Sequence, residues 1–397
     1  MINKAGLLIL FIYLLLSSLN PGVIHAQGEI SLVNSSAEAV FPDKLNFSLS
    51  VESNAAITDI RLRYIVNRTS FANVTSETYI LFEPSSKVDV SWALDMVKIS
   101  GLPPGSNVDY WWLIKNIEGN KVETSPVRVR FDDNRNSWQS ITEDKITIYW
   151  YEGNQSFVQE LMTLTQQSLN RLADNTGAYL EKPVKMYIYA NSKDLKGGMI
   201  YPQDWTGGVA FTRFNTLAIS IAPDDFSWAE QVIPHELTHL VIDQMTLNPY
   251  NDLPTWLDEG LAMYNEGELE PNYKAYLYKA VVEDTLITVR SLSSPFSAYA
   301  SEAALSYAQS YSFLEYLINT HNQSKMLELL NTFRQGSGYD EALIKVYGFD
   351  MDGLDMLWRD YIKGTENTNS LKTTEHSLMG ALALFNTKPV IAFGIAR

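Results

Sequence analysis

Hydrophobic and polar residues alternate in short runs through the N-terminal third of the chain. Runs with a period of two lie at residues 45–51, 60–66 and 127–131. Such alternation places one face of a strand against a core and the other face in water. Turn residues separate the runs, including Pro42-Asp43, Pro103-Pro104-Gly105 and Glu118-Gly119-Asn120. The pattern therefore predicts an all-β sandwich over residues 28–135.

A different pattern follows a polar linker at residues 132–137. Apolar runs predict strands at 146–151, 184–189, 207–211 and 216–221, and apolar residues at helical spacing predict a helix over 156–180. From residue 272 onward the pattern is nearly all helical, with predicted helices at 272–284, 300–320, 324–334, 339–347 and 352–363. We expect an α+β domain over residues 141–365 with a helical C-terminal half.

One turn in the predicted sandwich resembles a known one. Residues 101–106 read G-L-P-P-G-S and lead into Tyr110-Trp111-Trp112. This resembles the turn before the tyrosine-corner strand of fibronectin type III domains and related immunoglobulin-like sandwiches. The resemblance implies a sandwich of that kind. It would serve as a spacer or recognition module, or simply as a packing domain, because no side chains suited to catalysis gather there.

The two ends of the chain carry apolar segments. Lys4, the apolar run 6–16 and the small residue Ala26 match a secretory signal peptide over residues 1–26, with an uncleaved anchor as the alternative. Residues 366–397 form a polar linker and an apolar tail. Asn386, Lys388 and Pro389 interrupt that tail, which makes it a poor membrane span although anchoring stays open. We expect an extracytoplasmic protein, either secreted or held at the cell surface.

The composition excludes several classes of function. The chain has 46 acidic and 30 basic residues, a net charge of −16, which argues against nucleic acid or an anionic membrane surface as a partner. It has no cysteine. Disulfides, thiolate metal ligands, cysteine nucleophiles and a lipoprotein anchor are therefore excluded.

Two of the five histidines form one motif. Residues 235–239 read H-E-L-T-H. Because residues i and i+4 of a helix lie on one face, His235 and His239 can bind the same zinc ion. Glu236 can then act as a base toward water at that site.

A third ligand is predicted downstream. Glu259 follows His239 by 20 residues, within the sequence W-L-D-E-G-L-A at 256–262. That gap fits the rest of one helix, a turn and a second helix that returns onto the first. Two histidines and one glutamate leave the fourth position of a tetrahedral zinc ion open, whereas a structural site takes four protein ligands. The constellation therefore predicts a catalytic zinc site.

Together the two motifs resemble the gluzincins, the thermolysin and aminopeptidase N superfamily of zinc metallopeptidases. The second motif is close to the aminopeptidase N pattern W-L-N-E-G-F-A, with Asp258 in place of Asn. The strand–helix–strand lead-in is most similar to bacterial exported peptidase MA-like domains, over about residues 141–365. The resemblance implies Zn²⁺ held by His235, His239 and Glu259, with Glu236 as the general base of peptide hydrolysis.

The same resemblance assigns further roles. Tyr307 stands where the aminopeptidase N pattern has the tyrosine that hydrogen-bonds the oxyanion, and Tyr311, four residues later, is the alternative; either could instead be a buried packing residue. Residues 207–211 stand where aminopeptidases carry G-A-M-E-N, whose glutamate binds the free amine of the substrate. No acid occurs there in this chain. This departure favours an endopeptidase, with the strand pairing with an extended peptide.

Local details of the motif helix give further expectations. Asp224 or Asp225 is expected to cap it. Pro234 removes a backbone donor, which predicts either a kink at residues 230–234 or a helix that begins close to Pro234. Asp243, one turn past His239, is a candidate hydrogen-bond partner of the site, with a solvated surface position as the alternative.

Two hypotheses of different classes follow. The first is an exported zinc metallopeptidase whose partner is a peptide or protein substrate. The second is a binding or adhesion protein of the cell surface whose peptidase-like domain is catalytically idle. The intact Glu236 favours the first, because an idle domain does not need a base.

Overall fold

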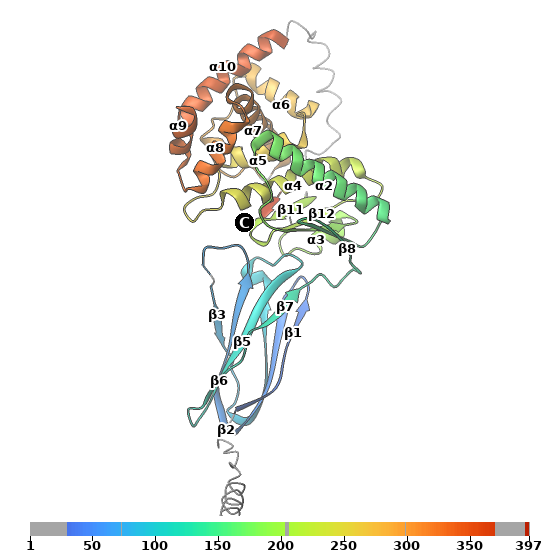
Figure 1. Cartoon of the computed structure of the whole chain (residues 1–397), viewed down its shortest axis with the longest axis vertical. Helices are drawn as coiled ribbons and strands as arrows, with labels where there is room; N and C mark the ends of the chain where they lie inside the picture. Colours follow the sequence, from blue (N-terminus) through green and yellow to red (C-terminus); the bar gives the residue numbers. More distant parts are fainter. Residues whose placement is uncertain (1–29, 73, 203–205, 298, 370–393, 397) are drawn as a thin grey trace, which may run out of the picture.

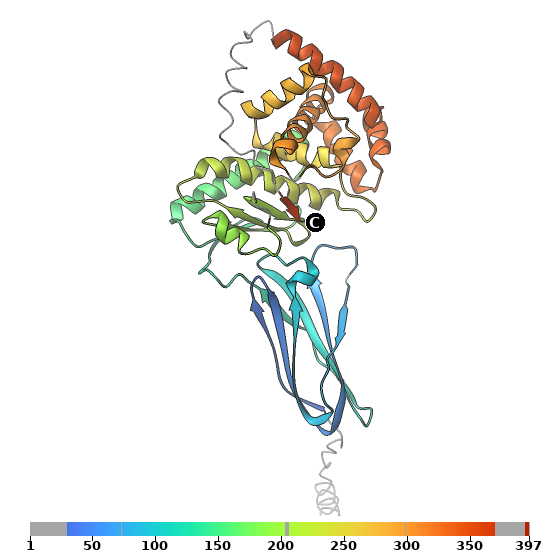
Figure 2. The ribbon, with the colours of Figure 1, turned by 180° about the vertical axis from the view of Figure 1, so that it is seen from behind.

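The computed structural model describes residues 30–72, 74–202, 206–297, 299–369 and 394–396 (Figures 1 and 2). An N-terminal β-rich domain is followed by a second sheet covered by helices, which confirms the predicted fold class. The predicted signal peptide and most of the apolar tail lie outside the described residues. Within the described part of the chain, no helix is both long enough and apolar enough to cross a membrane.

The N-terminal domain is one curled sheet of seven strands. They are β1 (Ile30–Val40), β2 (Lys44–Asn67), β3 (Ser76–Tyr79), β4 (Ser85–Asp95), β5 (Ser106–Asn116), β6 (Lys121–Glu123) and β7 (Val127–Phe131). The first half of β2 pairs with β1 and β4, and its second half pairs with β3 and β5. The runs at 45–51 and 60–66, expected as separate strands, are thus parts of one strand whose register shifts between Glu52 and Ile57. Such irregularities bend a strand, and the two halves of β2 pair with different strands of the curled sheet.

Alternation along these strands builds the core of the domain. Leu45, Phe47 and Leu49 are at most 1% exposed, whereas the residues between them face outward. From β5, Trp112 is fully buried and its indole N–H donates to Ser35 Oγ at 3.0 Å. The large aromatic side chain is therefore buried without leaving its polar atom unsatisfied.

The second sheet has the strand order β13-β11-β12-β10-β9-β8. Its strands are β8 (Gln139–Glu143), β9 (Ile146–Trp150), β10 (Val184–Tyr189), β11 (Gly208–Phe211), β12 (Thr216–Ser220) and β13 (Gly394–Ala396). β9, β10 and β12 are parallel, whereas β8 and β11 run antiparallel to their neighbours β9 and β12. The pattern missed β8 and the short helix α3 (Ser192–Lys196), and the sheet begins at Gln139, before the expected boundary at residue 141.

The two faces of β10 pack in different directions. Met186 and Ile188 pack in the core cluster shared with α2 (Gln155–Thr176) and α4 (Phe226–Thr246). Tyr187 and Tyr189 point the other way, because successive side chains of a strand alternate between its faces. There Tyr187 accepts a hydrogen bond from Arg130 at 3.0 Å, which joins the sheet to the N-terminal domain.

Another interdomain bond comes from the same strand. Lys185 Nζ donates to the Gly105 carbonyl at 2.7 Å. Burial, aided by the nearby Arg130 guanidinium, lowers the pKa of Lys185 to about 8. Lys185 therefore links the second sheet to the N-terminal domain through this hydrogen bond, although its charged form loses contact with water.

Helices cover the remainder of the second domain. They are α5 (Thr255–Glu266), α6 (Pro271–Val282), α7 (Ala300–His321), α8 (Gln323–Arg334), α9 (Tyr339–Tyr347) and α10 (Met351–Asn369). These agree with the expected helices to within a few residues, except at the last boundary. α10 continues to Asn369 through residues 366–369, which we expected to be linker.

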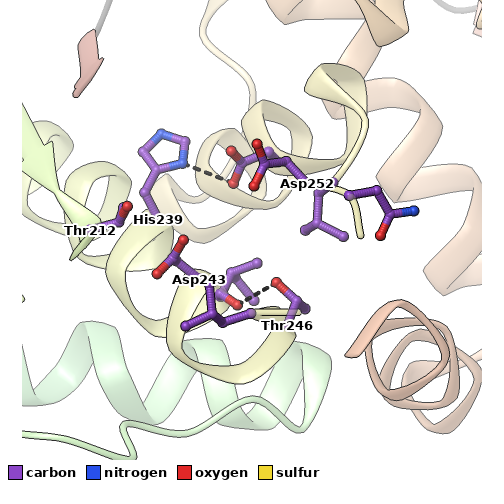
Figure 3. Close-up of a pocket in the computed structure, with 10 residues that line it drawn as sticks. Thr212, His239, Asp243, Thr246 and Asp252 are labelled. Atoms are coloured by element: carbon purple, nitrogen blue, oxygen red, sulfur yellow. Dashed lines mark hydrogen bonds and ion pairs between the residues drawn. The ribbon is translucent and has the colours of Figure 1, made fainter. Parts of the chain in front are cut away.

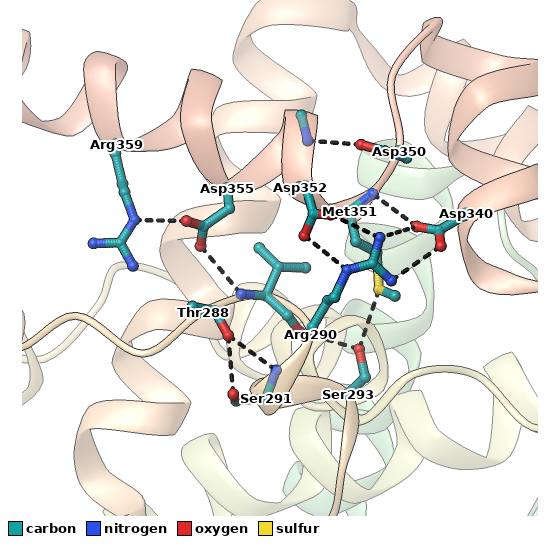
Figure 4. Close-up of polar contacts among 12 residues, drawn as sticks. Thr288, Arg290, Ser291, Ser293, Asp340, Asp350, Met351, Asp352, Asp355 and Arg359 are labelled. Atoms are coloured by element: carbon teal, nitrogen blue, oxygen red, sulfur yellow. Dashed lines mark hydrogen bonds and ion pairs between the residues drawn. The ribbon is translucent and has the colours of Figure 1, made fainter.

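A polar clamp fixes the connection between α6 and α7. Arg290 forms ion pairs with Asp340 at 3.0 Å and with Asp352 at 2.7 Å, which ties this connection to α9 and α10 (Figure 4). Nearby, the Val289 N–H donates to Asp355 at 3.1 Å. Thr255, the first residue of α5, donates to the Ser293 carbonyl in the same connection at 3.3 Å. The start of α5 is therefore attached to a segment that ion pairs and hydrogen bonds hold against α9 and α10.

Candidate metal centre

The central helix α4 is buried over most of its length. Every residue from Val232 to Ile242 is buried, which is why this helix lacks a strongly polar face. Asp225 caps it, as one of the two expected candidates, by accepting a hydrogen bond from the Trp228 N–H. Because the helix begins at Phe226, the expected start near Pro234 is wrong; a kink at residues 230–234 stays a prediction.

The structure brings the three predicted metal ligands together. His235 and His239 are one turn apart on α4, and Glu259 comes from the first half of α5, which packs against it. The Nε2 atoms of the two imidazoles lie 3.4 and 3.6 Å from Glu259 Oε2. Among the described residues, these three side chains form a group whose ligand atoms all lie within 4.8 Å of one another, close enough to hold one metal ion.

These separations fit a tetrahedral zinc ion. Two ligand atoms about 2.05 Å from a tetrahedral centre lie about 3.4 Å apart. His239 Nε2 is also buried without a hydrogen-bond partner among the described residues, so a nitrogen lone pair points into the group. A buried polar atom of this kind needs a partner. The residues present therefore fit Zn²⁺.

Carboxylates hold the other nitrogen of each imidazole. His235 Nδ1 lies 2.6 Å from Glu266 Oε1, and His239 Nδ1 lies 3.1 Å from Asp258 Oδ1. Because a carboxylate accepts, each Nδ1 carries the hydrogen and each Nε2 is left as the ligand atom. Glu266 was not identified from the sequence, although it lies seven residues after Glu259 on the same face of α5.

The electrostatics of the group also favour a cation. Burial acts to lower the pKa of His235, but hydrogen bonds to Glu259 and Glu266 outweigh burial and raise that pKa to about 10. Burial also acts to lower the pKa of His239, but the charges of Asp258 and Glu259 outweigh burial and raise that pKa. The imidazoles thus sit in a strongly negative environment, which a divalent ion would balance.

Glu236 lies between α4 and strand β11. Its side chain is fully buried, and burial raises its pKa to about 7, although His235 and His239 act to lower it. A Cβ placed on Gly208 would lie 3.0 Å from Glu236 Oε1. Glycine at this position of β11 therefore leaves the space that the carboxylate occupies.

The tyrosine candidates lie on α7. Tyr307 is 4% exposed and its ring packs edge-on against Phe296 at 5.2 Å. Tyr311 is 7% exposed and lies 5.6 Å from the ring of Tyr264. The structure adds a third tyrosine, Tyr273 on α6, whose pKa is raised by burial and then by the charges of Glu266, Glu270 and Glu259.

A small polar pocket lies on the Nδ1 side of His239 (Figure 3). Asp243 lines it together with Asp252 and Asp258. The partner of His239 Nδ1 is Asp258, whereas Asp243 was the candidate suggested by the sequence. The signal for Asp258 was its position directly before the ligand Glu259.

Comparisons with known proteins bear on this geometry. A family model for the Peptidase MA superfamily matches residues 164–364. The solved M1 zinc metallopeptidase of Deinococcus radiodurans is 13% identical, with a TM-score of 0.36 over 85% of this chain and 96% of that one. OgpA of Akkermansia muciniphila is 9% identical, with a TM-score of 0.21 over 27% of this chain and 28% of that one. The match thus spans less than a third of OgpA. No curated protein matches.

The family match covers just over half of the chain and includes α4 and α5, which carry the His₂Glu group. Within it, two imidazoles and a carboxylate converge, and a buried glutamate follows the first histidine. The chain belongs to the Peptidase MA superfamily, and its His₂Glu group has the arrangement expected of a gluzincin-type metal centre.

Proposed function

We propose that this protein is an exported endopeptidase that cleaves extended peptide segments within their length. The observation that carries the proposal is the position of Glu236. Its carboxylate is buried beside the His₂Glu group and against the backbone of β11. A peptide that pairs with the edge of β11 would bring its backbone carbonyls next to that base.

His235, His239 and Glu259 would hold zinc, and zinc when bound supplies a Lewis acid for the carbonyl and for water. Glu236 takes the proton from the attacking water and delivers it to the leaving amine. Glu266 and Asp258 keep the two imidazoles in the required tautomer and orientation. Tyr307 is proposed to hydrogen-bond the developing oxyanion, with Tyr311 and Tyr273 as alternatives.

The preference for internal bonds rests on β11. Residues 207–211 contain no acidic side chain that could bind a free amino terminus. A Cβ at Gly208 would also crowd Val232 Cγ2 at 2.9 Å and Glu236 Oε1 at 3.0 Å, so glycine leaves this part of the strand clear. An extended peptide could therefore continue along this edge in both directions from the bond that is cleaved. The idle binding protein is the weaker alternative, because an idle domain has no need to bury the carboxylate of Glu236 in this position.

The preference for internal peptide bonds can be tested with peptides that differ only in whether the amino terminus is free or acetylated. A library of ten-residue peptides is incubated with the zinc-loaded full chain, once with free and once with acetylated amino termini, and the products are identified by mass spectrometry. We expect internal cleavage at equal rates in both sets, and none after chelation. Release of single N-terminal residues that acetylation abolishes would contradict the endopeptidase proposal.

The proposal that the protein is exported rests on the predicted signal peptide at residues 1–26. Expression of the full chain in a secreting host, followed by N-terminal sequencing of the product, should show a mature chain that begins after Ala26. Retention of Met1 in a membrane fraction would instead indicate an uncleaved anchor.

A further inference from the structure

The outer edge of β11 is covered by a distant segment of the same chain. β13, residues Gly394–Ala396, pairs with β11 in parallel, with Val209 opposite Gly394, Ala210 opposite Ile395 and Phe211 opposite Ala396. More than 180 residues separate these strands in sequence. Figures 1 and 2 both show β13 beside β11, at one edge of the six-stranded second sheet.

This edge lies next to the catalytic base. α4 packs directly against β11, and a Cβ at Gly208 would come within 3.0 Å of Glu236 Oε1. A segment that pairs with β11 therefore runs beside the carboxylate proposed to activate water.

The backbone alternation of β11 determines which groups face outward. The Ser220 N–H donates to the Gly207 carbonyl at 2.9 Å, which makes these two residues a hydrogen-bonded pair with β12. In an antiparallel ladder such pairs alternate. Gly208 and Ala210 therefore direct their N–H and C=O groups away from β12, toward the edge where β13 lies. These are the groups that a docked peptide would also need.

One row of backbone groups can pair with only one strand at a time. We propose that residues 394–396 act as an internal competitor that occupies the substrate edge of β11 and keeps the peptidase partly self-inhibited. This inference rests on the proposed peptidase function. A three-residue strand forms few backbone hydrogen bonds, so an extended peptide with more of them can displace it.

The chemistry of the segment suits this role. Residues 394–396 read G-I-A and carry no charge. The occupant can therefore dock by its backbone without taking a charged side chain out of water. A charged segment would have to desolvate its side chains beside the buried carboxylates of the site.

Three variants test the proposal. The first lacks residues 394–397, and the second is Ala396→Pro. In the observed register Ala396 flanks the residue opposite Ala210, so proline removes the N–H that faces the Ala210 carbonyl. The third, Ala396→Ser, is a matched control that keeps this N–H. Hydrogen exchange of the Gly208 and Ala210 amides, and KM for an extended peptide, are measured for all three and for the full chain.

We expect the deletion and Ala396→Pro to lose protection at Gly208 and Ala210 and to lower KM about five-fold or more, with kcat unchanged. Ala396→Ser should match the full chain. A synthetic peptide of residues 386–397 should inhibit the deletion variant competitively, and it should bind the deletion variant carrying Glu236→Gln more tightly than the full-length Glu236→Gln protein.

Unchanged exchange and KM in the deletion variant would overturn the proposal. A lower unfolding temperature together with lower activity would also overturn it, because β13 would then be a structural strand. If the deletion variant does not fold, the full-length Ala396→Pro variant decides the matter through the same exchange and KM measurements. If no form cleaves peptides but exchange and peptide binding change as expected, the peptidase proposal fails while strand docking at β11 stands.

Discussion

Replacement of Gly260 by alanine tests how the third ligand is positioned. Gly260 follows Glu259 on α5, where the helix crosses α7. A Cβ at this position would lie 2.6 Å from the Ser310 carbonyl oxygen and 2.4 Å from Leu314 Cδ2. The leucine tip can rotate, but the carbonyl belongs to the backbone of α7. Ordinary contact begins at 3.4 Å, so the two helices must separate by about 0.8 Å.

The magnitude follows from this separation. Overpacking a core costs about 1–3 kcal/mol, and the better helix propensity of alanine returns up to about 1 kcal/mol. A net loss of about 1–2 kcal/mol lowers the unfolding temperature of a domain of this size by about 2–8 °C. Metal–ligand distances tolerate only about 0.2 Å, so moving Glu259 by several tenths of an ångström should weaken zinc binding at least about ten-fold.

The assay compares two glycines that both lie in helices. Calorimetry of the metal-free chain gives stability, and competition with a chromophoric chelator gives zinc affinity. Gly364→Ala on α10 is the control, because its Cβ would meet nothing within 4 Å. It should leave zinc affinity unchanged and raise stability slightly. Equal stability and zinc affinity in Gly260→Ala and the wild type would refute the argument from helix packing.

Three further predictions concern charge. Glu266→Gln and Asp258→Asn should each weaken zinc affinity by about 10- to 100-fold in chelator competition, because each loosens one imidazole; unchanged affinity would contradict the positioning role. The kcat/KM of the wild type should fall between pH 8 and pH 5, because burial raises the pKa of Glu236 to about 7 and the base must be ionised; a flat profile from pH 5 to 8 would contradict this. Lys185 has a folded pKa of about 8, below its ordinary value, so the unfolded chain binds more protons above pH 8 and stability rises from there to about pH 10.5. Denaturant unfolding of Lys185→Met should lack that rise, and an identical pH dependence in both proteins would contradict it.

The ligand group could be predicted because its signals are local. His235 and His239 are one helical turn apart, and that spacing alone places them on one face of α4. The strands β9 and β10 and the helices after residue 272 were located for a similar reason, since their apolar periodicity reflects burial within each element.

Other features depend on packing between elements and left no comparable signal. The contact of Glu266 with His235 exists only because α5 lies across α4. Pro234 was expected to kink α4 or to lie close to its start, but α4 begins eight residues earlier at Phe226, where Asp225 caps it. The joining of two runs into β2 depends on partners on both of its edges.

The most direct test of the central claim compares zinc-loaded wild type with Glu236→Gln. Glutamine keeps the shape of the side chain but cannot accept the proton from water. Zinc content by elemental analysis and the initial rate of peptide cleavage are measured on the same samples. The account predicts one zinc per chain in both proteins and a loss of at least about 100-fold in cleavage rate for the variant. Equal cleavage by both proteins would contradict it.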